Sequence, residues 1–312
     1  MQLPPRLSVA ICTHDRYPAL AQSVETLLWS QGFATADAEL LVIENTPAAR
    51  RQALDLPDRA DVRSVVCEEP GLSQARNCAI AAAQGEVIAF LDDDALVCDD
   101  WCSAILDRMH AGPELGALGG KVAPLFDSDD LPHWFDDRLC GHLSCIDWGD
   151  TPRFLRPGEW VVGANMAFRR EVVARFGGFD ANLGRRGTTS LLSNEETALL
   201  ARIGLHSVFY DPAMAVRHVI PPERLTPQWF RSRVYWQAVS DLVAGHVRSD
   251  DAGLRQEYGR LVVRLEARHR NLNALSFAPR DADEFQIQLR AIYLAAVVLA
   301  GGAGGAPEAG HA

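Results

Sequence analysis

The amino-acid sequence predicts an α/β protein whose mainly parallel sheet is flanked by helices and leads into a helical carboxyl-terminal extension. Three observations favour this class. The first half alternates short apolar runs with helix-like stretches, the pattern of strands joined by crossover helices. The run at 86–91 is almost continuously apolar, as expected for a strand covered on both faces. Thr226 and Pro227 open a helical region with residues typical of an N-cap and a first helical position.

The elements of the first half follow from the apolar spacing. Strands are expected at 7–12, 39–43, 62–66 and 86–91. Helices are expected at 19–29 and 73–84, and Gly85 should end the second of them in a left-handed conformation. Because ligands of open α/β sheets bind beyond the carboxyl ends of the strands, the end of the fourth strand is the expected site.

The second half of the sequence differs from the first in its residue types and their order. From 121 to 159, Pro, Asp, His and Trp follow one another irregularly, which predicts long loops or a small insertion over the site. Beyond it, the pattern predicts strands at 160–169 and 207–210 and helices at 193–204 and 226–270. The longest apolar run, 291–300, has about half the length of a bilayer span. It predicts a core or interfacial helix, followed by a disordered tail at 301–312.

Charge and cysteine content limit the classes of function. The net charge of −11 argues against a nucleic-acid partner, because binding a phosphate backbone needs a clustered positive surface. The seven cysteines are odd in number and lack zinc-ligand spacing, so we expect reduced thiols in a cytoplasmic protein. No secretory signal pattern is recognised, since the apolar run at 7–12 is short and leads directly into His14.

Three adjacent aspartates, Asp92, Asp93 and Asp94, follow the fourth expected strand. Their charges repel one another, whereas Mg²⁺ or Mn²⁺ prefers hard oxygen ligands of this kind. In an extended segment Asp92 and Asp94 point the same way, so they can share an ion that Asp93 does not reach. The alternative for the triplet alone is a solvated acidic turn.

The aspartate cluster is one of four short segments that carry polar or charged motifs along the chain. They are Thr13-His14-Asp15-Arg16, Ala75-Arg76-Asn77, Asp92-Asp93-Asp94 and Glu195-Glu196. In kind and order they resemble the donor-binding core of the family 2 glycosyltransferases, which have the GT-A fold, and the resemblance covers about residues 7–220. It implies a Rossmann-like GT-A domain that binds a nucleotide-diphosphate sugar and transfers the sugar to an acceptor hydroxyl.

The resemblance also implies roles in binding the nucleotide. Thr13, Asp15 and Glu44 match positions that line the nucleoside pocket, and Arg16 lies in the same turn. Arg76 matches a basic residue that faces the nucleotide, with a structural ion pair as the alternative.

In the same family, the first residue of the aspartate motif lies near the ribose and the last binds the metal on the diphosphate. These positions correspond to Asp92 and Asp94, with Asp93 between them. A cation there would stabilise the departing nucleoside diphosphate. His218 is the candidate third ligand, because GT-A enzymes often supply a late histidine; the alternative is a structural histidine.

Inversion at the anomeric carbon needs a base that takes the acceptor proton. The resemblance places Glu196 where the family usually has the Asp of a Glu-Asp pair. The side chain here is one methylene longer, so Glu195 remains a second candidate. Ser193 and Glu196 also have the spacing of a capping box, in which Glu196 only bonds the N-cap amide.

Further residues are expected around the sugar and the acceptor. Gly163 and Asn165 lie in a segment that resembles the one under the donor sugar, where glycine lets the backbone approach a ligand. Asp180 either contacts the substrate or caps its own turn. A basic and aromatic cluster either closes over the diphosphate, stacks on an acceptor or packs as an amphipathic helix. Its members are Arg224, Trp229, Arg231, Arg233, Tyr235 and Trp236.

These observations predict a glycosyltransferase that depends on Mn²⁺ or Mg²⁺ and inverts. Two alternatives remain: a nucleotidyltransferase, although no glycine follows the first strand, and a non-catalytic nucleotide-sugar binding protein, although the acidic pair is present. We expect a donor-binding part at 1–125, an acceptor-binding part at 126–220 and a helical extension at 221–300. The acceptor is a sugar, a lipid-linked sugar or a small molecule, and peripheral contact with the inner face of a membrane is compatible with it.

Overall fold

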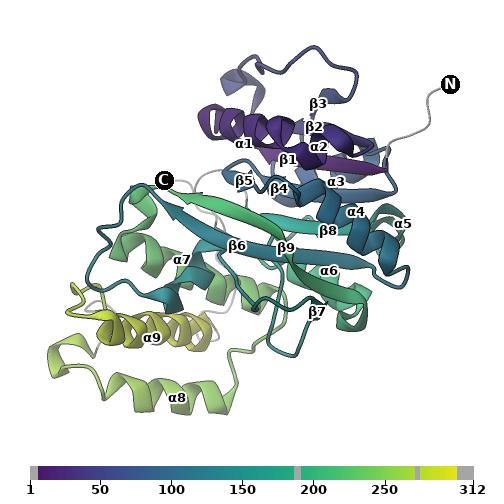
Figure 1. Ribbon diagram of the computed structural model, residues 1–312. Helices are drawn as coiled ribbons and strands as arrows, with labels where there is room; N and C mark the ends of the chain where they lie inside the picture. Colours follow the sequence, from purple (N-terminus) through teal and green to yellow (C-terminus); the bar gives the residue numbers. More distant parts are fainter. Residues whose placement is uncertain (1–5, 186–190, 271–274, 301–312) are drawn as a thin grey trace.

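The computed structural model describes residues 6–185, 191–270 and 275–300. In this part of the chain one sheet runs in the order β3-β2-β1-β4-β8-β6-β9-β5, with β7 paired to β9 (Figure 1). The first four strands are parallel, at β1 Leu7–Thr13, β2 Ala38–Glu44, β3 Val62–Val66 and β4 Val87–Asp92. Antiparallel pairing begins between β4 and β8. The remaining strands are β5 Ala95–Val97, β6 Ala117–Phe126, β7 Arg153–Phe154, β8 Asn165–Arg169 and β9 Val208–Ile220.

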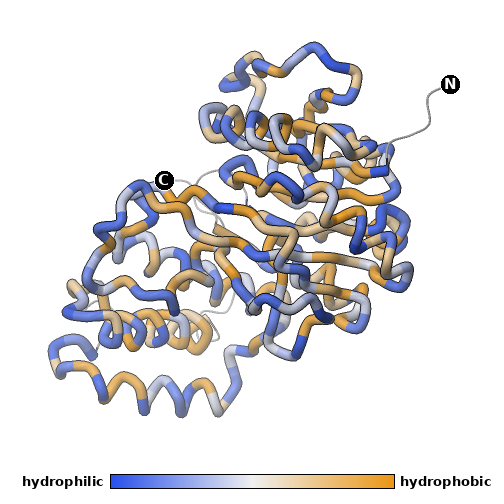
Figure 2. The backbone as a smooth tube through the Cα atoms, viewed as in Figure 1, coloured by the Kyte–Doolittle hydropathy of each residue, from blue (hydrophilic) through white to orange (hydrophobic). Residues whose placement is uncertain are grey.

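Helices cover both faces of this sheet. They are α1 Tyr17–Trp29, α2 Gln31–Thr35, α3 Leu72–Ala82, α4 Trp101–Ala111, α5 Arg170–Arg175 and α6 Glu195–Ile203. On β1, Leu7, Val9 and Ile11 share one core with α1 and α4, whereas Ala10 joins a second core with α3, α5 and α6. Because successive side chains of a strand point to opposite faces, an apolar strand fills both cores. Figure 2 shows this concentration of hydrophobic residues along the central strands.

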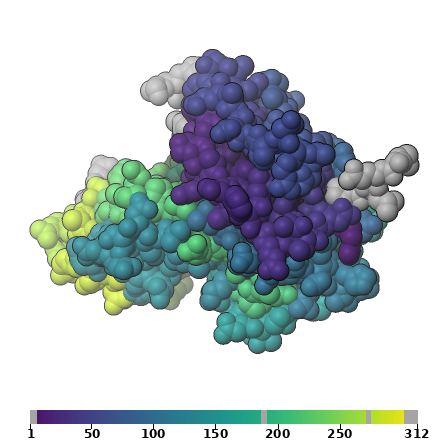
Figure 3. All heavy atoms as spheres, turned by 45° about the horizontal axis from the view of Figure 1, so that its top comes forward, coloured from purple at the N-terminus to yellow at the C-terminus, as the bar shows by residue number. Residues whose placement is uncertain are grey.

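Three helices follow the sheet and lie to one side of it, at α7 Pro227–Val243, α8 Ala252–Val262 and α9 Ala282–Ala300 (Figure 1). Figure 3 shows them beside the segment that follows β6. Trp134 makes this junction, with its ring centroid 5.8 Å from that of Phe230 and 4.8 Å from that of Phe285. Short 3-10 helices occur at Ala48–Arg50, Asp137–Leu143, Leu205–Ser207, Pro222–Arg224 and Ala267–His269.

The predicted cap of the extension is confirmed: the Thr226 hydroxyl accepts a hydrogen bond from the Trp229 amide, and Pro227 follows it. The single helix expected at 226–270 is wrong, because Gly245 has a positive φ of 73° and α7 and α8 are separate. The tail expected at 301–312 lies outside the described residues.

Strand β6 was not expected, β9 is longer than expected and β8 is shorter. β6 runs on to Phe126 within the stretch that we expected to be loops, and β9 has 13 residues where four were predicted. These strands pair with each other in parallel, so the pairing supports Pro124, a residue type that favours loops. β8 begins only at Asn165.

Gly85 does not end a helix, since α3 stops at Ala82 with an extended residue after it. The glycine is needed for close packing instead. A Cβ at this position would lie 2.6 Å from the backbone nitrogen of Ser8 and 2.8 Å from the carbonyl carbon of Leu7. Both distances are below van der Waals contact, so a side chain would push β1 away.

Asn165 joins three segments at the start of β8. Its side chain is fully buried; Oδ1 accepts a hydrogen bond from Trp101 Nε1 at 2.9 Å, and Nδ2 donates to the carbonyls of Met214 and Lys121 at 2.7 and 3.1 Å. All of its polar atoms are therefore used in holding β8 against its neighbours.

We predict that Asn165→Ala lowers the free energy of unfolding by about 3 kcal/mol, because three buried polar groups lose their partner. The matched control is Asn182→Ala at an exposed turn, which should stay within about 0.5 kcal/mol of wild type. Urea denaturation measures both. Equal stability of the two variants would contradict the structural role of Asn165.

Candidate functional site

A pocket of about 370 Å³ lies at the carboxyl ends of β1 and β4, the edge of the sheet where the sequence placed the site. Most of the residues predicted for the site line it. They are Thr13, Asp15, Arg16, Arg76, Asp92, Asp93, Gly163, Glu195 and Glu196. Asp94 and His218 are buried and reach the site through their contacts. Glu44 and Asn165 are not among the described residues that line the pocket.

Asp93 is a structural member of the aspartate cluster. Its carboxylate accepts hydrogen bonds from Thr13 Oγ1 at 2.8 Å and from Arg16 Nη1 at 2.7 Å. Burial raises the pKa of Asp93 to about 7, although the Arg16 charge opposes the rise. The carboxylate thereby ties the end of β4 to the end of β1.

Asp94 carries most of the charge compensation. Its Oδ2 lies 2.7 Å from Arg16 Nη2 and 3.2 Å from Arg224 Nη2, and its Oδ1 lies 3.0 Å from His218 Nε2. Burial alone would raise its pKa, but His218, Arg16 and Arg224 together hold it well below its usual range. Asp94 is therefore an ionised carboxylate in the protein interior.

His218 on β9 lies beside the aspartate cluster. Its Nδ1 is 2.9 Å from the Leu143 carbonyl, and since a carbonyl only accepts, Nδ1 carries the hydrogen. Nε2 then faces Asp94. Asp92, Asp94 and His218 each offer a ligand atom, and these atoms all lie within 4.8 Å of one another. Two carboxylates and an imidazole held by a carbonyl form a donor set that fits Mn²⁺ or Mg²⁺.

Arg76 on α3 forms the ion pair that the sequence left as an alternative. Its side chain is 2% exposed, with Nη1 2.7 Å from Glu195 Oε1 and Nη2 3.5 Å from Asp92 Oδ1. A Cβ at position 163 would collide with this guanidinium. Gly163 is therefore explained by the space that Arg76 needs, and Arg76 still lines the pocket.

Glu196 does not bond the Ser193 amide, so the capping-box alternative is wrong. The N-cap of α6 is Asn194, with a φ of 74° and no side-chain cap bond, and the Ser193 amide donates instead to Ser240 Oγ at 3.0 Å. Glu196 Oε2 is buried without a hydrogen-bond partner among the described residues. Burial first, and the neighbouring charge of Glu195 second, raise the pKa of Glu196 to about 8.

The turn after β1 is held by the strand beside it. Asp15 has a φ of 59°; its amide donates to Thr46 Oγ1 at 2.8 Å and its carboxylate pairs with Arg50 at 2.7 Å. Glu44 accepts a hydrogen bond from the Thr46 amide at 2.9 Å, and its other carboxylate oxygen is buried without a partner in the described structure.

Two residues that were not predicted from the sequence, Asn45 and Arg185, also line the pocket. Asn45 Nδ2 donates to the carbonyls of Cys67 and Glu69, and its Oδ1 accepts from the Gly71 amide. Its place directly after β2, beside the turn that follows β1, is the signal that could have identified it. No comparable signal marks Arg185.

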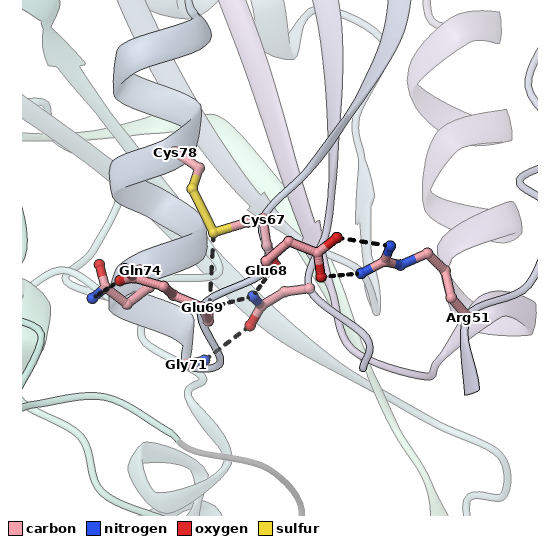
Figure 4. Close-up of a disulfide and its surroundings, with 8 residues drawn as sticks. Arg51, Cys67, Glu68, Glu69, Gly71, Gln74 and Cys78 are labelled. Atoms are coloured by element: carbon pink, nitrogen blue, oxygen red, sulfur yellow. Dashed lines mark hydrogen bonds and ion pairs between the residues drawn. A yellow bond between two sulfur atoms is a disulfide. The ribbon is translucent and has the colours of Figure 1, made fainter. Parts of the chain in front are cut away.

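A disulfide joins Cys67, after β3, to Cys78 on α3 (Figure 4). The expectation of seven reduced thiols is therefore wrong for this pair, because the fold brings together two cysteines that the CxxC and zinc-ligand patterns did not connect. The other five cysteines are free. Cysteine content no longer argues for a reducing compartment.

The predicted basic and aromatic cluster divides into two groups. Arg224 and Arg233 line the pocket, whereas Arg231 bonds Gln288 and the Phe277 carbonyl. Trp229, Tyr235 and Trp236 contact aromatic neighbours on α7. Asp180 accepts hydrogen bonds from the backbone and side chain of Asn182, as a turn residue does.

The model of "Glycosyl transferase family 2" matches residues 8–175, which is more than half of the chain. The chain belongs to this family. It is a glycosyltransferase with a GT-A fold, and the nucleotidyltransferase alternative falls away. The match contains the turn after β1, the α3 arginine and the aspartate cluster, and it ends before Glu195.

Two relatives extend the similarity beyond the family model. The glycosyltransferase is 28% identical over 245 residues to the glucosyl-dolichyl phosphate glucuronosyltransferase of Haloferax volcanii, covering 76% of this chain and 77% of the relative. It is 25% identical over 307 residues to the succinoglycan biosynthesis protein ExoM of Rhizobium meliloti, covering 94% and 91%.

A solved structure supports the fold. The structure of GalNAc-T7 with UDP, GalNAc and Mn²⁺ has a TM-score of 0.50 and 14% identity, over 83% of this chain and 55% of the other. Within the residues described, the glycosyltransferase has no helix that is both long and apolar enough to cross a membrane.

We predict that Mn²⁺ raises the melting temperature of the wild type, because an ion that binds only the folded state stabilises it. His218→Ala should weaken Mn²⁺ affinity about tenfold or more. The matched control is His206→Ala at an exposed histidine, which should keep the wild-type response in a thermal-shift titration. An unchanged Mn²⁺ response in His218→Ala would contradict the ligand assignment.

Proposed function

We propose that this glycosyltransferase moves a sugar from a nucleoside-diphosphate sugar to an acceptor hydroxyl, with a divalent cation and with inversion. The observation that carries the proposal is the grouping of Asp92, Asp94 and His218 beside the pocket that Glu196 also lines. The family membership and the Mn²⁺ and UDP in the GalNAc-T7 structure support it.

In this proposal Asp92, Asp94 and His218 hold Mn²⁺ or Mg²⁺. The cation, when bound, stabilises negative charge on the diphosphate leaving group. Arg16 and Arg224, which contact Asp94 from the pocket side, provide further positive charge for the diphosphate. Thr13, Asp15 and Asn45 border the space for the nucleoside at the ends of β1 and β2.

Glu196 is the proposed base. Its free oxygen is buried at the pocket, and a carboxylate with a raised pKa takes up a proton more readily than an ordinary one. Glu195 is held by Arg76 at 2.7 Å, so it acts as the partner that fixes the start of α6. The acceptor hydroxyl gives its proton to Glu196 as its oxygen attacks the anomeric carbon from the face opposite the diphosphate.

The division of labour along the chain is also proposed. Residues 1–125 bind the donor, 126–220 provide the acceptor side, and 221–300 close the pocket through Arg224 and Arg233. The names of the two relatives refer to a glucosyl-dolichyl phosphate and to succinoglycan. We therefore favour a sugar acceptor on a lipid carrier, reached by peripheral contact with a membrane.

Metal-dependent nucleotide binding tests the proposal directly. Isothermal titration with UDP, GDP, ADP and dTDP, each with Mn²⁺ and with chelator, should identify one diphosphate whose affinity falls about tenfold or more without the metal. Failure of all four to bind wild type with Mn²⁺ would reject the proposed function.

Glu196→Gln should lower turnover by about 10²-fold or more, the scale of losing a general base. Donor affinity and melting temperature should change little, because the amide keeps the size of the side chain. Glu195→Gln, the matched neighbour, should instead destabilise the protein by removing the charge partner of Arg76. Loss of turnover in Glu195→Gln with full activity in Glu196→Gln would identify Glu195 as the base and contradict the assignment to Glu196.

The pH profile should report the same group. Because the base must be deprotonated and the pKa of Glu196 in the free protein is raised to about 8, kcat/KM should rise with pH and level off above about 8. The residual rate of Glu196→Gln should lack this inflection. A wild-type kcat/KM that is flat between pH 6 and 9, a window of about one to two units around that pKa, would contradict the assignment.

A further inference from the structure

One wall of the pocket carries a guanidinium that the metal site does not account for. Arg233 on α7 donates through Nη2 to Gln237 Oε1 at 2.9 Å and to Ser193 Oγ at 3.4 Å, and both partners are neutral. Its Nη1 is buried and has no hydrogen-bond partner among the residues described. Arg185 lines the same pocket.

The charge of Arg233 is poorly compensated. Burial first, and the nearby Arg185 charge second, lower the pKa of Arg233 to about 10, although the charges of Glu196, Glu195 and Asp241 oppose the shift. In the described part of the chain, Arg233 forms no ion pair with a carboxylate, and the sequence at 186–190 contains no Asp or Glu. A buried guanidinium without a counter-charge is costly, and an anion from a ligand would remove that cost.

The position of Arg233 distinguishes this anion from the donor diphosphate. Arg16 and Arg224 both contact Asp94, so they belong to the metal end of the pocket. Arg233 contacts Ser193, three residues before Glu196. Its ligand therefore belongs to the part of a substrate that lies close to the base.

We propose that Arg233, assisted by Arg185, binds a carboxylate or phosphate that a substrate carries in addition to the donor diphosphate. The inference rests on the proposed function and narrows the substrate class to anionic sugars. A guanidinium donates two parallel hydrogen bonds to either anion. The two sources are a hexuronate as the donor sugar and a sugar phosphate as the acceptor.

Titration calorimetry with Mn²⁺ separates these sources. The first arm uses the nucleoside diphosphate that binds and compares its uronate ester with the ester of the matching neutral sugar, for example UDP-glucuronate with UDP-glucose or GDP-mannuronate with GDP-mannose. The second arm adds glucose 1-phosphate or glucose to the protein saturated with Mn²⁺ and that nucleoside diphosphate. Wild type should prefer the anionic ligand about ten- to a hundredfold in one of the arms, the scale of hydrogen bonds to a charged group.

Arg233→Gln should abolish the preference for the anionic ligand, while affinity for the nucleoside diphosphate stays within about twofold of wild type. Arg233→Lys should keep part of the preference, because a lysine retains the charge but lacks the two parallel N–H donors of the guanidinium. The control is Arg248→Gln, the same charge change at a side chain 80% exposed, which should keep the full preference. Melting curves identify any variant that does not fold. If Arg233→Gln does not fold, the presence or absence of an anion preference in wild type decides the outcome.

Preference for the uronate donor assigns the anion to the donor, and preference for glucose 1-phosphate assigns it to the acceptor. Normal binding of the nucleoside diphosphate without any preference for an anion would overturn the anion proposal alone. A preference that persists in a folded Arg233→Gln would overturn the role of Arg233. If none of UDP, GDP, ADP and dTDP binds wild type with Mn²⁺, it is the proposed nucleotide site that fails.

Discussion

The compensation of charge around the aspartates at the end of β4 is the constraint on which the site depends. Asp94 is 3% exposed, and an isolated carboxylate at such a depth would be too costly to remain ionised. Arg16 and Arg224 supply the opposing charge, and His218 Nε2 lies 3.0 Å from Asp94 Oδ1. These three residues come from the turn after β1, the start of the extension and β9. Three parts of the chain that are distant in sequence therefore meet at one buried carboxylate.

Adjacent acidic residues at this site have different tasks. The Asp93 carboxylate is bonded to Thr13 and Arg16, whereas Asp92 borders the pocket. Glu195 forms an ion pair with Arg76, whereas Glu196 forms no ion pair among the described residues; each of the two keeps one buried carboxylate oxygen without a partner there. Asp92 ends β4 and Asp93 follows it in a turn, and neighbours on a helix point about 100° apart. One member of each pair can therefore support the fold while the other remains available for chemistry.

Strands β1 to β4 could be predicted because local sequence determines them. Short apolar runs identified these strands, and the motifs beside them identified most of the residues that line the pocket. Other features depend on contacts between distant segments: β6 and β9 stabilise each other although Pro124 lies in their register, and Cys67 meets Cys78 only after β3 and α3 pack together. Asn165 shows the same limit, since its motif suggested a ligand contact whereas its hydrogen bonds hold the sheet.

Electron–nuclear double resonance of Mn²⁺ bound together with the nucleoside diphosphate tests the central claim most directly. If His218 and the diphosphate bind the same ion, nitrogen and phosphorus hyperfine couplings should both appear, and the nitrogen coupling should vanish in His218→Ala. A phosphorus coupling without a nitrogen coupling would remove His218 from the metal site. Absence of both couplings would contradict a metal-bound diphosphate at Asp92, Asp94 and His218.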